Sequence, residues 1–233
     1  MSDTAVRRAA VVGAGAWGTT FACLLAEAGT PTTVWARRED VASEINAGTN
    51  ERYVPGRRLP EGVSATSDLM RAIRGAEIVV AAVPSQSARD VLSPLHGRLE
   101  DDAVAVSLMK GVELGTGLRM SQVLAEALDL PAERVAVISG PNLADEIAAR
   151  QPTATVVAAA DEHVASRVAA LCATSTFRPY TNTDVLGVEL CGAVKNVIAL
   201  AVGAAAGCGF GDNSKATIIT RGLVEITRLG LAL

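Results

Sequence analysis

Lys195 is the residue whose surroundings in the sequence point most directly to acid–base chemistry. It is the single charged residue between Leu190 and Gly211, in a run that predicts a helix. On that helix it shares a face with small or apolar side chains, namely Val188, Cys191, Gly192, Ala199 and Val202. Such a face leaves room for a ligand, and loss of water around the ammonium group lowers its pKa toward the range useful for proton transfer. The alternative is a lysine that extends from the rim of the helix into solvent.

A second lysine, Lys110, follows an apolar run at residues 104–108 that predicts a strand. The same arrangement recurs where the apolar run 135–139 is followed by Gly140, Pro141 and Asn142. Ligands of open α/β sheets bind outside the carboxyl ends of the strands, so we expect these residues to share one cleft. Lysines in such a cleft indicate an anionic substrate.

The third candidate site is a glycine-rich turn, Gly13-Ala14-Gly15-Ala16-Trp17-Gly18, between a predicted strand at residues 9–12 and a helix that runs to about residue 28. In a dinucleotide-binding fold the first glycine permits the tight turn, the second admits a pyrophosphate, and the third allows close helix–strand contact. The free N–H groups and the helix dipole favour the phosphate charge. This strand–turn–helix context favours nucleotide binding over a glycine turn without function.

Arg37 and Arg38 bear on which dinucleotide the turn would hold. They follow a predicted strand at residues 32–35, about 20 residues after the glycines, where a carboxylate would bind the 2′-hydroxyl of NAD. Two guanidinium groups instead suit a 2′-phosphate, so NADP(H) is favoured and NAD(H) stays possible. The alternative is that both arginines only cap a surface turn.

The elements that must position these residues alternate along most of the chain. Short apolar runs predict strands at residues 9–12, 32–35, 78–83, 104–108, 135–139 and 154–159. Helical patterns separate them, which predicts a doubly wound Rossmann-type α/β fold with a parallel sheet covered on both faces. From about residue 184 the pattern is only helical and is interrupted at residues 207–211. We therefore expect a dinucleotide-binding domain at 1–184 and the start of an all-α domain at 185–233.

The composition of the chain argues against nucleic-acid binding, a disulfide framework, a metal site and membrane insertion. The 233 residues carry 25 acidic and 21 basic side chains, with no basic run longer than two, which argues against nucleic-acid binding. Four scattered cysteines predict no disulfide framework, and two distant histidines predict no metal site, so a reducing cytoplasm is expected. Residues 190–211 are long enough to span a membrane. Their Ala/Gly content and interior lysine instead favour a buried helix and no membrane insertion.

Several motifs, in order along the chain, carry a resemblance to a known family. They are the turn at 13–18, Ser107-Leu108-Met109-Lys110-Gly111, Ser139-Gly140-Pro141, and GVELCGAVKN at 187–196, with further matches at 209–213 and 219–222. Together they resemble the bacterial-type NAD(P)-dependent glycerol-3-phosphate dehydrogenases over essentially the whole chain. The 187–196 stretch is specific to that family, whereas the glycine motif is shared by dinucleotide folds in general.

The resemblance implies a role for each matching residue. Lys195 corresponds to the proton acceptor and a substrate contact, and Lys110 to a contact of both cofactor and substrate. Gly140 and Asn142 correspond to substrate contacts, although the family usually has Ser or Thr in place of Asn142. The matching cofactor contacts are Ala16, Trp17, Arg37 and Ala144. The family also continues past residue 233, so we expect a truncated chain with an incomplete second domain.

The activity implied is reversible hydride transfer between NAD(P)H and dihydroxyacetone phosphate, giving glycerol 3-phosphate for phospholipid synthesis, with Lys195 as general acid and base. A homodimer is possible. Two alternatives stay open. One is a related two-domain enzyme, such as a hydroxyacid dehydrogenase or a ketopantoate reductase. The other is a fragment that binds cofactor without catalysis.

Overall fold

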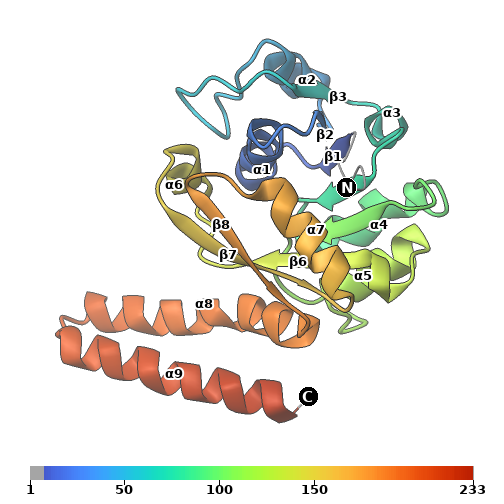
Figure 1. Cartoon of the computed structure of the whole chain (residues 1–233). Helices are drawn as coiled ribbons and strands as arrows, with labels where there is room; N and C mark the ends of the chain where they lie inside the picture. Colours follow the sequence, from blue (N-terminus) through green and yellow to red (C-terminus); the bar gives the residue numbers. More distant parts are fainter. Residues whose placement is uncertain (1–7, 233) are drawn as a thin grey trace.

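A single mixed sheet organises the chain in the computed structural model, which describes residues 8–232 (Figure 1). Its strand order is β3-β2-β1-β4-β5-β6-β7-β8. The first six strands are parallel and have the doubly wound order of dinucleotide-binding folds. They are β1 (Ala9–Val12), β2 (Thr32–Trp35), β3 (Val63–Thr66), β4 (Ile78–Ala81), β5 (Val104–Ser107) and β6 (Val135–Ser139).

The far edge of the sheet departs from the predicted parallel arrangement. β7 (Thr153–Ala159) pairs antiparallel with β6, and β8 (Phe177–Asn182) pairs parallel with β7. Between β6 and β7 the chain forms only the short helix α6 (Ala144–Ala148), so it turns back beside β6 instead of crossing over the sheet. The longer helix α7 (Glu162–Cys172) then carries the chain across to β8. The predicted parallel sheet is thus confirmed for β1 to β6, whereas the strand predicted at residues 154–159 runs antiparallel to its neighbour β6.

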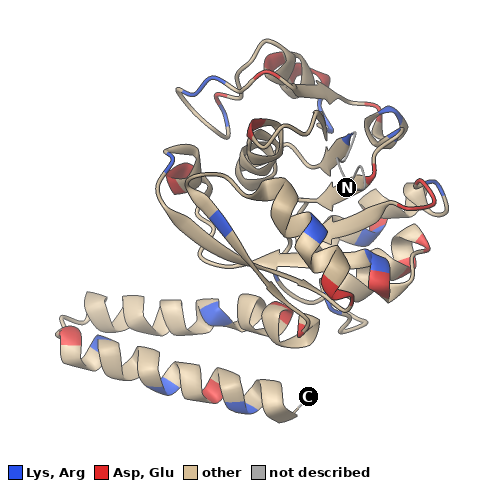
Figure 2. Cartoon of the chain, viewed as in Figure 1, with Lys and Arg blue, Asp and Glu red and all other residues tan. Residues whose placement is uncertain are grey.

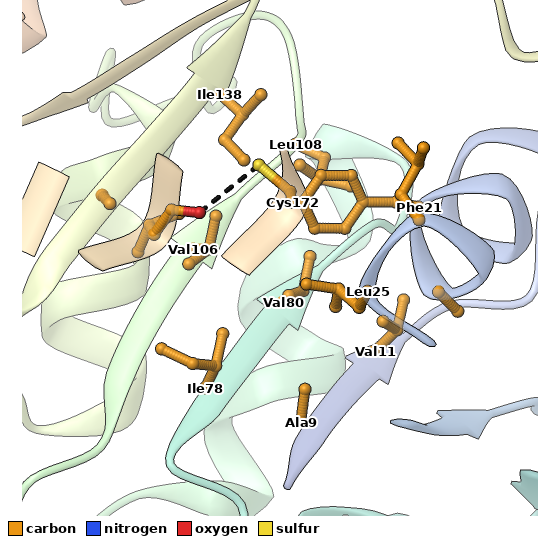
Figure 3. Packing of buried hydrophobic residues seen from close by; sticks show 14 of the residues in the cluster. Ala9, Val11, Phe21, Leu25, Ile78, Val80, Val106, Leu108, Ile138 and Cys172 are labelled. Atoms are coloured by element: carbon orange, nitrogen blue, oxygen red, sulfur yellow. Dashed lines mark hydrogen bonds between the residues drawn. The ribbon is translucent and has the colours of Figure 1, made fainter. Parts of the chain in front are cut away.

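Helices cover both faces of the sheet, as the apolar strands predict. Alternate residues of β1 and β4 pack into two separate cores, Val11 and Val80 into one and Val12 and Val79 into the other. The first core lies under α1 (Ala16–Glu27), α2 (Glu39–Asn46) and α7, and includes Phe21, whose ring extends from α1 (Figure 3). The second lies under α3 (Leu69–Ile73), α4 (Ala88–Leu92) and α5 (Met120–Leu128). Short 3₁₀ turns occupy Ser85–Ser87, Ser93–Leu95 and Ala132–Arg134.

Two long helices follow the sheet and pair with one another. α8 (Val185–Gly207) begins where the Asp184 carboxylate accepts a hydrogen bond from the Gly187 N–H at 2.8 Å. α9 (Asp212–Ala232) runs back beside it after the predicted glycine-rich turn (Figure 1). The predicted α/β fold followed by helices is thus confirmed.

The expectation that residues 190–211 form a buried helix is wrong. Only Glu189, Gly192 and Ala205 are buried along α8. The helix contacts β6 and β7 and packs along α9, which leaves side chains such as Leu200 (76% exposed) in solvent. Figure 2 shows that α8 is nearly free of charge, with Glu189 and Lys195 as its two charged residues. By length and composition α8 passes as a possible membrane span, which is weak evidence for one.

Candidate active site

The glycine-rich turn lies between β1 and α1 and is shaped by close backbone contacts. Gly13 has φ +123°, and a Cβ there would lie 2.4 Å from the Ala82 carbonyl oxygen. A Cβ on Gly18 would lie 2.1 Å from the Gly13 carbonyl oxygen. Gly15, in contrast, faces open space within 4 Å. Packing therefore requires glycine at 13 and 18, whereas the space at Gly15 leaves the start of α1 accessible to a ligand.

A cavity of about 340 Å³ borders this turn. Residues from the turn, from the end of β2 and from the segment after β4 line it, among them Gly13, Gly15, Arg37, Arg38, Tyr53, Pro84 and Ser87. The structure thus brings both predicted arginines to the glycine turn. Tyr53, Pro84 and Ser87 were not predicted, because their segments carry no recognisable motif. Ala16 and Trp17 do not line the cavity; the Trp17 ring packs edge-on against Phe21, with 5.5 Å between ring centroids.

The two arginines differ in their partners. Arg38 precedes α2 and donates two hydrogen bonds to the Asp40 carboxylate. In one of them Nε donates to Oδ1 at 2.9 Å. This hydrogen-bonded guanidinium lowers the pKa of the Asp40 carboxyl to about 2. The Arg37 side chain is exposed and makes neither a hydrogen bond nor an ion pair with residues 8–232. The alternative of arginines that only cap a surface turn fits the contact of Arg38 with Asp40 at the start of α2. Arg38 nevertheless also lines the cavity beside the glycine turn.

Lys110 occupies the carboxyl end of β5 and reaches the next strand. Its Nζ donates a hydrogen bond to the Gly140 carbonyl oxygen, which follows β6, at 3.1 Å. Burial lowers the pKa of Lys110, and the positive charge of Lys195 lowers it further. The structure therefore brings Lys110 and Gly140 together at the carboxyl ends of β5 and β6, as the positions of the strands predict, and Lys195 on α8 lies near them.

Lys195 lies on α8 at a cavity of about 510 Å³ that Ser139, Gly140, Gly187, Gly192 and Leu223 also line. Its ammonium group donates to the Asn196 side chain at 3.2 Å. The expectation of a desolvated lysine is wrong, because the Lys195 side chain is exposed. The reason lies in the packing of α8, whose buried Gly192 contacts the sheet almost one turn earlier, so that Lys195 stands at the rim of the cavity.

Asn142 and Ala144 lie outside that cavity lining. The Asn142 side chain donates to the Thr155 hydroxyl at 2.9 Å, and its own Oδ1 is buried without a hydrogen-bond partner in the part of the chain described here. Ala144 is the first residue of α6 and is partly buried. The Asn142 side chain therefore links the segment after β6 to Thr155 on β7. This contact helps to hold the backbone around Gly140 in place.

Glu189 is a residue of this region that sequence reasoning missed. Its buried carboxylate on α8 accepts hydrogen bonds from the Ser121 N–H (2.8 Å), the Ser121 hydroxyl (2.6 Å) and Arg119 (2.5 Å), at the start of α5. A carboxylate is favoured at the N-terminus of a helix. A lone acidic residue in an apolar helix was the available signal, but its partners lie 68 and 70 residues away in sequence.

Among residues 8–232 the structure contains neither a candidate metal site nor a disulfide bond. No group of three or more His, Cys, Asp or Glu side chains is placed to hold a metal ion there. The four cysteines are free, and burial raises the pKa of the Cys23 and Cys172 thiols to about 12.

Comparison with protein families gives two adjacent matches. A family described as NAD-dependent glycerol-3-phosphate dehydrogenase N-terminus matches residues 8–165, and the corresponding C-terminus family matches residues 184–233. Among curated proteins, the glycerol-3-phosphate dehydrogenases (NAD(P)+) of Streptomyces griseus and Thermobifida fusca are 59% and 55% identical. In each case the match covers 97% of this chain and 68% of the relative.

Solved structures give the same picture. Glycerol-3-phosphate dehydrogenase from Coxiella burnetii superposes with a TM-score of 0.87 at 36% identity, covering 96% of this chain and 68% of that one. A ketopantoate reductase from Ralstonia eutropha has a TM-score of 0.60 at 22% identity, covering 82% of this chain and 60% of that one, a likeness of fold alone.

Proposed function

The chain belongs to the NAD-dependent glycerol-3-phosphate dehydrogenase family, and we propose that it interconverts dihydroxyacetone phosphate and glycerol 3-phosphate with NAD(P)(H). The chain is therefore an oxidoreductase, and its product would enter phospholipid synthesis. The observation that carries the proposal is the meeting of Lys110, the Gly140 carbonyl and Lys195 beside a cavity at the strand ends. Two ammonium groups there suit a phosphorylated substrate.

The glycine turn and its cavity fit a dinucleotide. The first N–H groups of α1 have no partner within the helix, and the space at Gly15 lets a pyrophosphate approach them. Ala16 and Trp17 would then contact the cofactor through backbone N–H groups, which explains why their side chains lie elsewhere. Arg37 and Arg38 would meet the adenosine end, and Lys110 and Ala144 the nicotinamide end. When bound, the cofactor supplies or accepts the hydride.

Lys195 is the residue we assign to proton transfer. In the reducing direction its ammonium group donates a proton to the oxygen of the substrate carbonyl, and in the oxidising direction the neutral amine takes the proton from the hydroxyl. Lys110, held by Gly140, would bind the substrate beside it, with backbone groups at Gly140 and the Asn142 region completing the site. A positioned acid or base contributes roughly 10²- to 10⁴-fold to a rate.

We also infer the organisation around this site. A boundary at residue 184 agrees with the end of β8 at Asn182 and the start of α8 at Val185. The anchoring of α8 on α5 through Glu189 and the charge of Lys195 favour a helix outside the membrane, and the free cysteines favour the reducing cytoplasm. The exposed apolar side chains of α8 and α9 are compatible with a homodimer.

The test is turnover of the purified chain with NADPH and each of dihydroxyacetone phosphate, ketopantoate and a short 2-keto acid. We expect oxidation of NADPH, followed by its loss of absorbance, with dihydroxyacetone phosphate alone. Turnover of ketopantoate instead would make the chain a reductase of the alternative class. Binding of NADPH with no turnover of any substrate would favour the cofactor-binding alternative.

A further inference from the structure

Asp40 forms an ion pair with one of the two guanidinium groups that line the dinucleotide cavity. Arg37 and Arg38 both contribute to the cavity wall. Arg38 already holds the Asp40 carboxylate through Nε and Nη2, whereas Arg37 has no such partner among residues 8–232. The two neighbouring arginines are therefore not equivalent toward an incoming anion.

The local backbone explains why Asp40 and Arg38 meet. Arg38 is the N-cap residue of α2, with extended φ and ψ of −106° and 132°, and Asp40 is the second residue of the helix. Asp40 is also favoured there by the helix dipole, whether or not Arg38 is engaged. With its pKa lowered to about 2, the carboxylate stays ionised throughout the physiological pH range.

A 2′-phosphate and the Asp40 carboxylate compete for the same donors. Both present two oxygens to one edge of a guanidinium group, and Asp40 already takes the Nε/Nη2 edge of Arg38, so a phosphate there would have to displace it or use the remaining Nη donors. A 2′-phosphate that approached Arg38 would also meet the negative charge of Asp40. The neutral 2′-hydroxyl of NADH meets neither penalty, so the pair disfavours one cofactor selectively.

We propose that Asp40 sets the cofactor preference of this chain by holding Arg38, so that of the two guanidinium groups only Arg37 has no partner among the described residues, and NADH can compete with NADPH. This inference rests on the proposed function, since it assigns the 2′-position of the dinucleotide to the cavity beside Arg37 and Arg38. Asp40 would then determine cofactor specificity from outside the glycine turn and outside the catalytic centre.

The chain offers a matched control one residue away. Glu39 is also a carboxylate in the first turn of α2, but it accepts a hydrogen bond from the Ser67 hydroxyl, away from Arg38. Glu39→Gln and Asp40→Asn remove the same charge from the same helical turn. Only the second substitution frees Arg38.

The experiment measures the dissociation constants of NADPH and NADH by calorimetry, at one ionic strength, for the 233-residue chain and its variants. Surface ion pairs are weak, so we expect Asp40→Asn to raise the preference for NADPH about two- to fivefold. Glu39→Gln should change this preference less than about twofold, since it leaves the pair intact. In the Arg38→Ala background, Asp40→Asn should lose most of its effect.

Three results would overturn the inference: no change in the preference with Asp40→Asn, an equal change with Glu39→Gln, or an undiminished change without Arg38. In each of these cases both cofactors still bind and the proposed function stands. If the wild-type chain binds neither cofactor, the proposed function and the inference fail together. Circular dichroism of each variant verifies that α2 and the sheet remain folded.

Discussion

A Cβ on Gly192 would lie 2.6 Å from the Ser139 hydroxyl oxygen, so α8 rests on the carboxyl end of β6 with no room for a side chain between them. Gly192 is buried, and the Lys110 side chain lies 4.0 Å from the same position. Because Lys195 follows on the same helix, this close approach helps to place the two lysines of the candidate active site near one another.

Gly192→Ala should therefore displace α8 and lower both stability and turnover. Overpacking typically costs about 1–3 kcal/mol in the free energy of unfolding, measurable by urea denaturation. Gly203→Ala is the matched control, because Gly203 lies on α8 with open space around it and should gain about 0.5–1 kcal/mol. Ser139→Ala should restore part of the loss. Equal effects at the two glycines would show that the contact with Ser139 is unimportant.

Lys195→Met should reduce turnover by about 10²- to 10⁴-fold while the dissociation constant of NADPH changes little, since the glycine turn is untouched. Stopped-flow rates and calorimetry measure the two quantities separately. Lys215→Met on α9 is the control, because Lys215 pairs with Asp212 and lines neither the dinucleotide cavity nor the Lys195 cavity. Near-normal turnover of Lys195→Met would remove this lysine from the mechanism.

Glu189→Ala should destabilise the attachment of α8 to α5. The substitution leaves Arg119 and the Ser121 N–H without their buried carboxylate, a loss of about 3 kcal/mol for a broken buried pair. Glu225→Gln breaks an exposed pair with Arg228 on α9 and should change stability by less than about 1 kcal/mol. Hydrogen exchange at the start of α8 should quicken in the first variant only. Unchanged exchange there would show that other contacts anchor the helix.

The charge state of Lys110 should depend on Lys195. Because the neighbouring positive charge helps to lower the pKa of Lys110, Lys195→Met should raise that pKa toward the ordinary value, with the part due to burial remaining. NMR titration of the lysine side chains measures the pKa of Lys110 in the wild-type chain and in the variant. Because the pKa of Lys110 is lower in the folded than in the unfolded chain, the charged form of Lys110 destabilises the fold at neutral pH. This loss of stability fades as the pH rises above the folded-state pKa. A fall in the pKa of Lys110 would contradict the geometry.

The interior of the fold was predictable from local pattern. Strands such as β1 and β4 are buried on both faces, so their unbroken apolar runs follow directly from the helices on each side. The edge strands β3 and β8 were missed, because their residues are mostly polar or half-exposed and carry no such run. The glycine motif was equally readable, because backbone contacts within the turn or with the neighbouring strand require glycine at 13 and 18, and Gly15 leaves space for a ligand.

What the sequence determined by itself was therefore the two-sided sheet, the glycine turn, the helical end of the chain and the residues of its family motifs. The tertiary structure alone decided that β7 runs antiparallel to β6, that α8 is largely exposed, and that Glu189 finds its partners on α5. It also decided that Asp40 holds Arg38, while Arg37 has no side-chain partner among residues 8–232. The physical reason is range: burial patterns and turns depend on neighbouring residues, whereas exposure and ion pairing depend on which segments, distant or adjacent, the folded backbone brings into contact.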